Sequence, residues 1–109
     1  MKSPDVYETY IPMSESAYYI LLSLRKPRHG YGIILHVEDI TSGRLRLGPG
    51  TIYGTLSRFE KDGLIRAEEE ENRRKAYSLT GTGREILERE ILRIEELLKN
   101  GRNAKGGAG

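Results

Sequence analysis

The segment from Pro49 to Lys61 places side chains that can bind nucleic acid on one side of an expected helix. Ile52, Leu56 and Phe59 fall within roughly 60° of one another at helical spacing, so they mark its buried side. The opposite side carries Gly50, Gly54, Ser57 and Lys61, flanked by Thr51, Tyr53 and Arg58, and Pro49 stands at the start of the helix. These side chains are short or carry hydroxyl groups or positive charge. Short side chains let a helix approach a phosphate-lined groove, while hydroxyls and cations reach phosphates and base edges. These residues are therefore the first candidates for contacts with double-stranded DNA.

A second group of candidate contacts lies in an expected β-hairpin that follows this helix. Segments 64–70 and 74–79 are typical of two strands, with a turn near 71–73. The candidate residues of this group are Arg73, Arg74, Lys75 and Tyr77. Cations at a hairpin tip bind the phosphate backbone, and such contacts position a protein on DNA more than they select a sequence.

Four consecutive carboxylates, Glu68 to Glu71, count against DNA contact by this hairpin. They would repel phosphates if they pointed the same way as the cations. Strand alternation divides them between the two sides of the strand. In the alternative arrangement, some of them pair across the hairpin with Lys75 or Arg74 and orient the hairpin.

Two further helices are expected ahead of the first candidate group. One begins near Ser14, a favourable N-cap, and extends to about Arg25; the other opens at 29–32 after Pro27. Apolar residues at helical spacing mark their buried sides: Ala17, Ile20, Leu21 and Leu24, then Ile33, Val37 and Ile40. The basic connector 44–47 alternates apolar and charged residues, which is compatible with a brief strand.

The helix that carries the first candidate group has the clearest boundaries. Gly48 precedes Pro49, and proline is favoured at the first helical position because its missing N–H needs no partner there. Asp62 and Gly63 follow Lys61 and end the helix.

A last helix is expected over 81–99, with Thr80 as its N-cap or, as the alternative, a capping box formed by Thr82 and Glu85. Its apolar residues are spaced four, three and four apart and form a candidate dimer interface: Leu87, Ile91, Ile94 and Leu98. The seam is too short for a free coiled coil, so it packs either on its own domain or on a second copy of the chain. Segment 1–13 is expected to be an irregular arm, and the Gly-rich segment 100–109 a disordered tail.

Length and composition limit the function classes. The 109 residues suit one domain, and charged residues make up 31% of them. The net charge is only +2, but the stretch from Arg25 to Lys61 contains seven basic residues and only three acidic ones. A mildly basic middle favours a nucleic-acid partner, because release of counterions supplies much of the affinity for DNA.

Several kinds of site are not expected. The chain has no cysteine, which excludes disulfides and thiolate metal ligands, and it has no apolar run long enough to cross a membrane. His29 and His36 have no Asp or Cys partner at ligand spacing, so neither an enzyme nor a metal or other cofactor is expected. The cytoplasm is the simplest location.

Five motifs in order resemble the PadR family of transcription regulators. They are YYILLSL at 18–24, HGYG at 29–32, LGPGTIY at 47–53, LSRFEKDGLI at 56–65 and RKAYSLT at 74–80. Each motif alone is weakly specific, but their order and spacing together are specific. The resemblance covers about 14–98, with Phe59 where the family usually has leucine and Gly54 where larger residues are common.

This resemblance implies a mainly α fold with a small β-hairpin (α+β), a winged helix-turn-helix with a C-terminal dimerisation helix. The DNA-binding domain would span 14–80 and the dimerisation helix 81–99. The P-G-T-x-Y match implies DNA contacts by Pro49, Gly50, Thr51 and Tyr53, and the R-K-x-Y match implies contacts by Arg74, Lys75 and Tyr77. The expected function is that of a homodimeric repressor on a pseudo-palindromic operator.

The resemblance also implies a small aromatic or amphipathic effector near the dimer interface. Candidate lining residues are Tyr18, Leu22 and Leu92, with core or dimer packing as the alternative role of each. A rival hypothesis is a winged-helix protein-interaction module without DNA binding. The two hypotheses differ in salt dependence, since affinity for duplex DNA falls steeply as salt rises.

Overall fold

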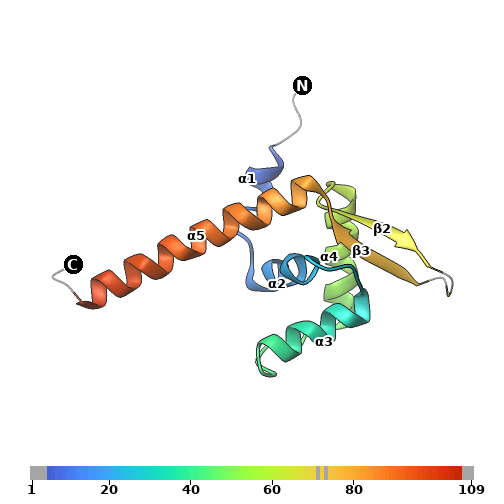
Figure 1. Ribbon diagram of the computed structural model, residues 1–109, viewed down its shortest axis with the longest axis horizontal. Coiled ribbons are helices and arrows are strands. Elements are labelled where there is room, and N and C mark those ends of the chain that lie inside the picture. Colours follow the sequence, from blue (N-terminus) through green and yellow to red (C-terminus); the bar gives the residue numbers. More distant parts are fainter. Residues whose placement is uncertain (1–4, 71, 73, 107–109) are drawn as a thin grey trace.

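The computed structural model describes residues 5–70, 72 and 74–106. Its elements are, in chain order, α1 (Val6–Tyr10), α2 (Glu15–Ser23), β1 (Arg28–His29), α3 (Gly30–Ile40), α4 (Pro49–Lys61), β2 (Ile65–Glu69), β3 (Lys75–Leu79) and α5 (Gly81–Gly106). Figure 1 shows α2, α3 and α4 gathered below α5, with the β2–β3 hairpin projecting at one end. The expected mainly helical fold with a small β-hairpin is confirmed.

The helix starts follow local capping chemistry. Ser14 caps α2, since its Oγ accepts a 3.1 Å hydrogen bond from the Ala17 N–H. Gly48 is the N-cap of α4 and Pro49 its first residue, as the sequence predicts. Gly63, just after α4, has φ +82°, a left-handed conformation that favours glycine and turns the chain into β2.

The sheet has three antiparallel strands in the order β1-β3-β2. Ile65 pairs with Leu79 and Glu69 with Lys75, so the expected hairpin and its register are present. The sequence did not predict β1, in which Arg28 pairs with Tyr77. The strand considered at 44–47 is wrong, because this connector has no regular structure. Two of its arginines pair instead with carboxylates on helices: Arg44 with Glu15, and Arg46 with Glu38.

One apolar core joins α2, α3, α4 and the hairpin to the start of α5. Its fully buried members include Ile20, Leu21, Ile33, Val37, Ile52, Leu56, Phe59, Leu64 and Ile86. Ile40 was expected in the same stripe but is 43% exposed, because it is the last residue of α3 and the chain turns away after it.

The helix α5 begins where the sequence predicts. Thr80 Oγ1 accepts a 3.1 Å hydrogen bond from the Gly83 N–H and donates to the Gly63 carbonyl at 2.6 Å. Gly83 lies directly against the Leu64 carbonyl oxygen, where a Cβ has no room. The start of α5 is thereby fixed against the end of the α4–β2 connection.

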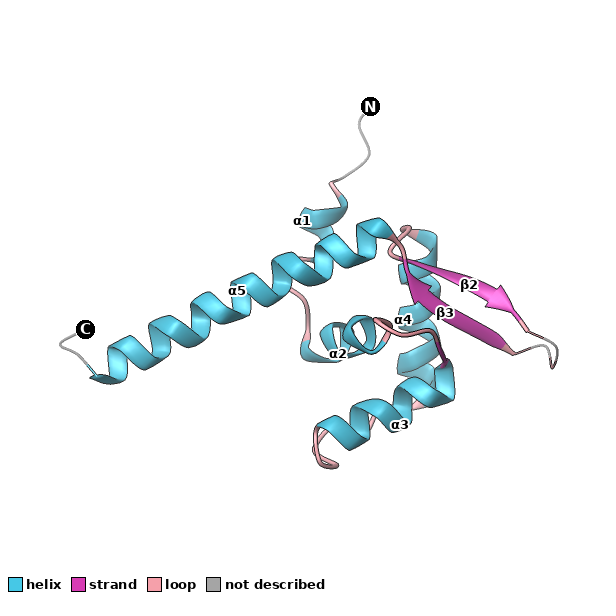
Figure 2. Ribbon diagram, viewed as in Figure 1, coloured by secondary structure: helices cyan, strands magenta, loops and turns pink. Residues whose placement is uncertain are grey.

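The expected disordered tail is wrong over 100–106, where α5 continues to Gly106. Asn100 and Gly101 are weak helix formers, but no proline follows, and Arg102 and Ala104 are strong ones. Residues 107–109 lie outside the described part of the chain. In Figure 2, the second half of α5 extends well beyond the other helices.

The prediction of an irregular N-terminal arm is wrong over Val6–Tyr10, which form the helix α1. This helix is bonded to α5. Tyr7 donates a 3.0 Å hydrogen bond from its hydroxyl to Glu85 Oε2, and the Arg89 guanidinium lies 3.9 Å from the Tyr7 ring centroid. The Met13 N–H donates a 2.8 Å hydrogen bond to Glu90 Oε2. The arm folds because apolar and polar partners on α5 order it, which local sequence alone does not reveal.

Candidate nucleic-acid interface

The exposed side of α4 carries the residues that the sequence singled out. Its buried side is Ile52, Leu56 and Phe59, none more than 1% exposed. All eight candidates of α4 are exposed: Pro49, Gly50, Thr51, Tyr53, Gly54, Ser57, Arg58 and Lys61. The helix therefore presents a face of short side chains, hydroxyls and two cations.

Gly50 and Gly54 have no packing role within the described chain. A Cβ added at either glycine meets no atom within 4 Å. Each also costs helix stability, since glycine in a helix interior is less favourable than alanine by about 1 kcal/mol. Glycines on an exposed helix face leave room for another surface to come close to the helix backbone.

Tyr53 connects α4 to the start of α3. Its side chain is 50% exposed, but its ring covers Gly30: a Cβ on Gly30 would lie 2.7 Å from the Tyr53 hydroxyl oxygen. Gly30 thus serves this close approach of α3 and α4, which keeps the Tyr53 hydroxyl on the side of α4 that faces the hairpin.

A pocket of about 340 Å³ lies where α3, α4 and β3 meet. Its lining residues are His29, Gly30, Tyr31, Tyr53, Arg74, Lys75 and Tyr77. The pocket brings the two groups of sequence candidates together, because Tyr53 comes from α4 and the two cations come from the hairpin. Cations and phenol hydroxyls around one opening suit a phosphate group.

The hairpin candidates divide into two kinds. Arg74 and Lys75 are exposed, as DNA contacts require. Tyr77 is only 8% exposed, which corrects its expected place on the surface. It faces inward because Ile65 and Leu79, on the same side of the sheet, are core residues, and burial raises the pKa of its hydroxyl. Arg73 lies outside the described residues.

Two carboxylates of the glutamate run lie near partners on other strands. Glu70 Oε2 lies 3.0 Å from His29 Nε2, so this carboxylate faces a residue of β1. Glu69 is paired in register with Lys75, opposite it on β3. Glu68 and Glu69 remain exposed. The repulsion that the glutamate run suggested is therefore reduced at Glu70 and retained at Glu68.

Three of the seven cations between Arg25 and Lys61 form ion pairs. Arg25 lies 3.6 Å from Glu88, Arg46 lies 3.6 Å from Glu38, and Arg44 pairs with Glu15. Within the described part of the chain, no ion pair involves the exposed cations of α4 and the hairpin: Arg58, Lys61, Arg74 and Lys75. The charge of these four cations is thus available to a partner.

A contact that sequence reasoning missed supports the end of α4. The Tyr10 hydroxyl donates a 2.6 Å hydrogen bond to Asp62 Oδ2, and the Arg58 guanidinium lies 6.0 Å from the Tyr10 ring centroid. The apolar pattern showed that Tyr10 could pack, but nothing local pointed to Asp62, fifty-two residues away.

The family model for the transcriptional regulator PadR-like family matches residues 19–89. This stretch runs from the middle of α2 through α3, α4 and the hairpin to the first third of α5. The chain belongs to the PadR-like family. Its relatives include the Escherichia coli transcriptional regulator YqjI, 37% identical over 78 residues, which are 69% of this chain and 38% of YqjI. The chain spans less than two thirds of the curated relatives it matches.

Solved structures agree with the PadR-like assignment. A transcriptional regulator from Clostridium thermocellum superposes with a TM-score of 0.72 at 26% identity, covering 94% of this chain and 96% of that one. Bacillus subtilis PadR, solved in complex with operator DNA, has a TM-score of 0.58 at 25% identity and covers 69% of this chain and 46% of that one. The winged helix-turn-helix expected from the sequence is therefore the fold of this PadR-like chain.

The candidate dimer residues of the PadR-like chain lie on α5 but differ in exposure. Leu87 is 1% exposed and belongs to the chain's own core, which corrects its place in an interface. Ile91 and Ile94 are partly buried, and Leu98 is 52% exposed. Leu92 and Leu97, at 63% and 55% exposure, add to the apolar surface beyond the body. The unpartnered apolar surface of α5 is its second half.

The candidate effector residues lie on two helices, Tyr18 and Leu22 on α2 and Leu92 on α5. Tyr18 and Leu22 are partly buried against the core, and Leu92 is exposed. Burial raises the pKa of the Tyr18 hydroxyl. Within residues 5–70, 72 and 74–106, no group of three or more His, Asp or Glu side chains is arranged to hold a metal ion. No helix of the described PadR-like chain is long and apolar enough to span a bilayer.

Proposed function

We propose that this chain is a homodimeric, sequence-specific DNA-binding repressor. The observation that carries the proposal is the exposed face of α4, where Gly50 and Gly54 keep open space between hydroxyls and unpaired cations. A helix with such a face fits the major groove of B-DNA, with side chains at base edges and phosphates. The operator complex of Bacillus subtilis PadR, a protein of the same fold, supports the choice of partner.

The hairpin acts as the wing in this proposal. Arg74 and Lys75 would bind backbone phosphates beside the groove that α4 enters, and Tyr53 would contribute its hydroxyl from α4. Contacts of this kind supply affinity and register, while α4 supplies sequence choice. Because transcription regulators act on DNA, we place the protein in the cytoplasm.

The second half of α5 supports self-association. Leu92, Leu97 and Leu98 are each more than half exposed on a helix that extends beyond the body (Figure 1). Ile94 and Leu98 lie four residues apart on one side of this helix, and a contiguous apolar side on an extended helix is typical of a protein interface. A second copy related by a two-fold axis would cover it and would place two α4 helices in successive major grooves, about 34 Å apart.

A small aromatic or amphipathic effector is the proposed input. Tyr18, Leu22 and Leu92 would line an apolar cleft that the second copy completes. An effector in that cleft would change the angle between the two α5 helices and thereby the spacing of the two α4 helices. Coupling of about 1–3 kcal/mol is enough to release DNA.

The experiment is selection of bound fragments from a pool of random duplexes, followed by size-exclusion chromatography with light scattering. We expect an enriched pseudo-palindrome with half-sites one helical turn apart, and a dimer at micromolar concentration. Failure to enrich any sequence, together with salt-independent capture of a protein ligand by the same face, would favour the alternative function of a protein-interaction module. A clean monomer would contradict the two-fold arrangement.

A further inference from the structure

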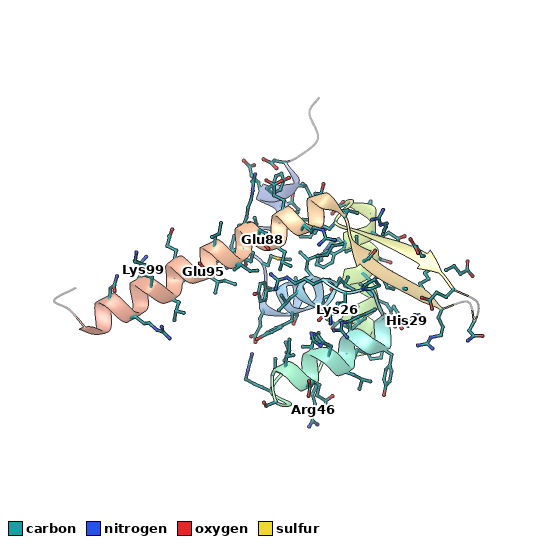
Figure 3. The ribbon with its side chains drawn as sticks, viewed as in Figure 1. Lys26, His29, Arg46, Glu88, Glu95 and Lys99 are labelled. Carbon is teal, nitrogen blue, oxygen red and sulfur yellow. The ribbon has the colours of Figure 1, made fainter. Side chains whose placement is uncertain are left out.

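His29 lies at the junction of α3 and the wing and contacts the residues that flank the open ends of both wing strands. Its Nε2 is 3.0 Å from Glu70 Oε2, and Glu70 directly follows β2. Arg74, which directly precedes β3, places its Nη2 3.3 Å from His29 Nδ1. Figure 3 labels His29 where α3 begins, below the hairpin. One imidazole therefore joins the two ends of the wing to the body of the domain.

The imidazole is not used for capping. His29 occupies the N-cap position of α3, but its side chain makes no capping hydrogen bond there. N-cap side chains normally accept a hydrogen bond from the first turn of the helix. The ring of His29 is instead turned toward Glu70 and Arg74, with 28% of its side chain exposed.

The two contacts together define one proton arrangement. An arginine guanidinium only donates, so His29 Nδ1 must accept and cannot carry a proton. A neutral imidazole then carries its proton on Nε2, which donates to the Glu70 carboxylate. The chain of hydrogen bonds runs from Arg74 through His29 to Glu70, and the Glu70 N–H donates back to the Arg74 carbonyl at 2.8 Å.

We propose that His29 is a positioning residue that holds Arg74 and the wing toward a DNA phosphate through this hydrogen-bond chain. The inference rests on the proposed DNA-binding function. Arg74 uses one of its five N–H donors for the hydrogen bond to His29, and its other donors remain available for phosphate oxygens. The role also explains Glu70: its carboxylate accepts from the imidazole beside the wing, so it orients the cations instead of opposing them.

The site that Arg74 would complete is the pocket between the wing and α4. Lys75 adds a second cation, while Tyr31 and Tyr53 add hydroxyls. Tyr77 lines the same pocket at 8% exposure. A phosphate oxygen there would meet donors from α3, α4 and β3, so the angle of the wing decides whether all of them reach it.

A double-mutant cycle on a selected operator duplex tests the proposal. Binding is measured by fluorescence anisotropy for His29→Ala, Arg74→Ala and the double variant. Lys75→Ala is the matched control, because Lys75 is the neighbouring wing cation and makes no hydrogen bond to His29. His29→Gln tests rescue, since its amide both donates and accepts without titrating.

We expect His29→Ala to weaken binding by about three- to tenfold, the effect of losing one hydrogen bond of ordinary net strength. In the Arg74→Ala background the same change should have no further effect, whereas in the Lys75→Ala background it should keep its full effect. His29→Gln should stay within about twofold of wild type. Additive effects of His29→Ala and Arg74→Ala, or unchanged binding by His29→Ala, would overturn the positioning role.

Imidazole nitrogen NMR gives a readout that does not depend on DNA, and its wild-type arm needs no variant. Wild type should show His29 protonated on Nε2, and Arg74→Ala should shift the Nδ1 resonance. Protonation on Nδ1 would overturn the hydrogen-bond chain. If wild type binds no duplex at all, the proposed function fails; if wild type binds and the cycle is additive, only the role of His29 fails.

Discussion

The hydroxyl of Tyr10 donates a 2.6 Å hydrogen bond to Asp62 Oδ2, which joins the N-terminal arm to the residue that caps the end of α4. The Tyr10 ring meets Phe59 edge-on, with centroids 5.5 Å apart and an interplanar angle of 68°. Tyr10 lies outside residues 19–89, the part matched by the family model. The arm thus helps to fix the helix proposed to read DNA.

Tyr10→Phe should lower the free energy of unfolding by about 1 kcal/mol, because it removes one hydrogen bond and keeps the ring packing. Urea denaturation measures this loss. Tyr31→Phe is the control, since its side chain is 63% exposed. Equal stability of Tyr10→Phe and wild type would mean that the hydrogen bond to Asp62 contributes nothing.

The same hydroxyl predicts an alkaline transition. Burial, followed by the hydrogen bond to Asp62, raises the pKa of Tyr10 to about 12. A folded pKa raised above the unfolded value of 10.0 stabilises the fold below pH 10, and this contribution is lost as pH rises toward 12. Absorbance at the phenolate band should show a late component that Tyr10→Phe lacks.

Glu90→Gln should destabilise the fold by about 1–3 kcal/mol at neutral pH, as loss of a buried charged acceptor does. The Glu90 side chain is fully buried and accepts from Arg93 at 2.6 and 2.8 Å and from the Met13 N–H at 2.8 Å. Urea denaturation of the variant measures the effect. Glu96→Gln, an exposed position on the same helix, is the matched control.

The pH dependence of the free energy of unfolding at acid pH should also change in Glu90→Gln. The hydrogen bonds from Arg93, above all, lower the pKa of Glu90. A lowered folded pKa gives stability that is present above the unfolded pKa and is lost as pH falls through the folded value. Wild type should therefore lose more stability than Glu90→Gln between about pH 5 and pH 3. Parallel acid limbs would contradict this role of Glu90.

Local signals in the sequence were sufficient for α4 but not for β1. Gly48 and Pro49 begin α4, Gly63 follows its end, and three apolar residues at helical spacing orient it. The two-residue strand β1 has no pattern of its own, because it exists only through its pairing with β3. Helix periodicity and capping act within a few residues, whereas strand pairing joins distant segments.

The candidate site shows the same division. The exposed face of α4 could be predicted because its buried side could be predicted. Tyr77 could not be placed, since strand alternation has two solutions and only contact with the core selects one. The roles of His29 and Glu90 depend on partners forty-one and seventy-seven residues away. No local pattern carries such information.

Leu98→Asp should convert the proposed dimer into a folded monomer. Leu98 is 52% exposed in the single chain, so a carboxylate there costs little in the monomer but is unfavourable in an apolar interface. Size-exclusion chromatography with light scattering measures the mass. Leu87→Ala is the contrasting variant: this residue is 1% exposed, and the loss should be about 2–5 kcal/mol of folding stability. A Leu98→Asp protein that stays dimeric would place the interface elsewhere.

Gly54→Ala should stabilise the fold while weakening DNA binding. A Cβ at Gly54 meets no atom within 4 Å, and alanine in a helix is favoured over glycine by about 1 kcal/mol. Gly54→Leu should weaken duplex binding further without unfolding the protein. Gly101→Ala has the same open surroundings on α5, so it should stabilise the helix and leave DNA binding unchanged. Full DNA affinity in Gly54→Leu would show that the groove does not approach this face.

The salt dependence of duplex binding tests most directly whether the exposed face of α4 contacts DNA. Affinity for the selected operator is measured from low to high salt for wild type, Lys61→Glu and Lys99→Glu, an exposed charge reversal on α5. Wild-type affinity should fall steeply with salt, Lys61→Glu should abolish specific binding, and Lys99→Glu should behave as wild type. Specific binding with unchanged affinity and salt slope in Lys61→Glu would contradict the account.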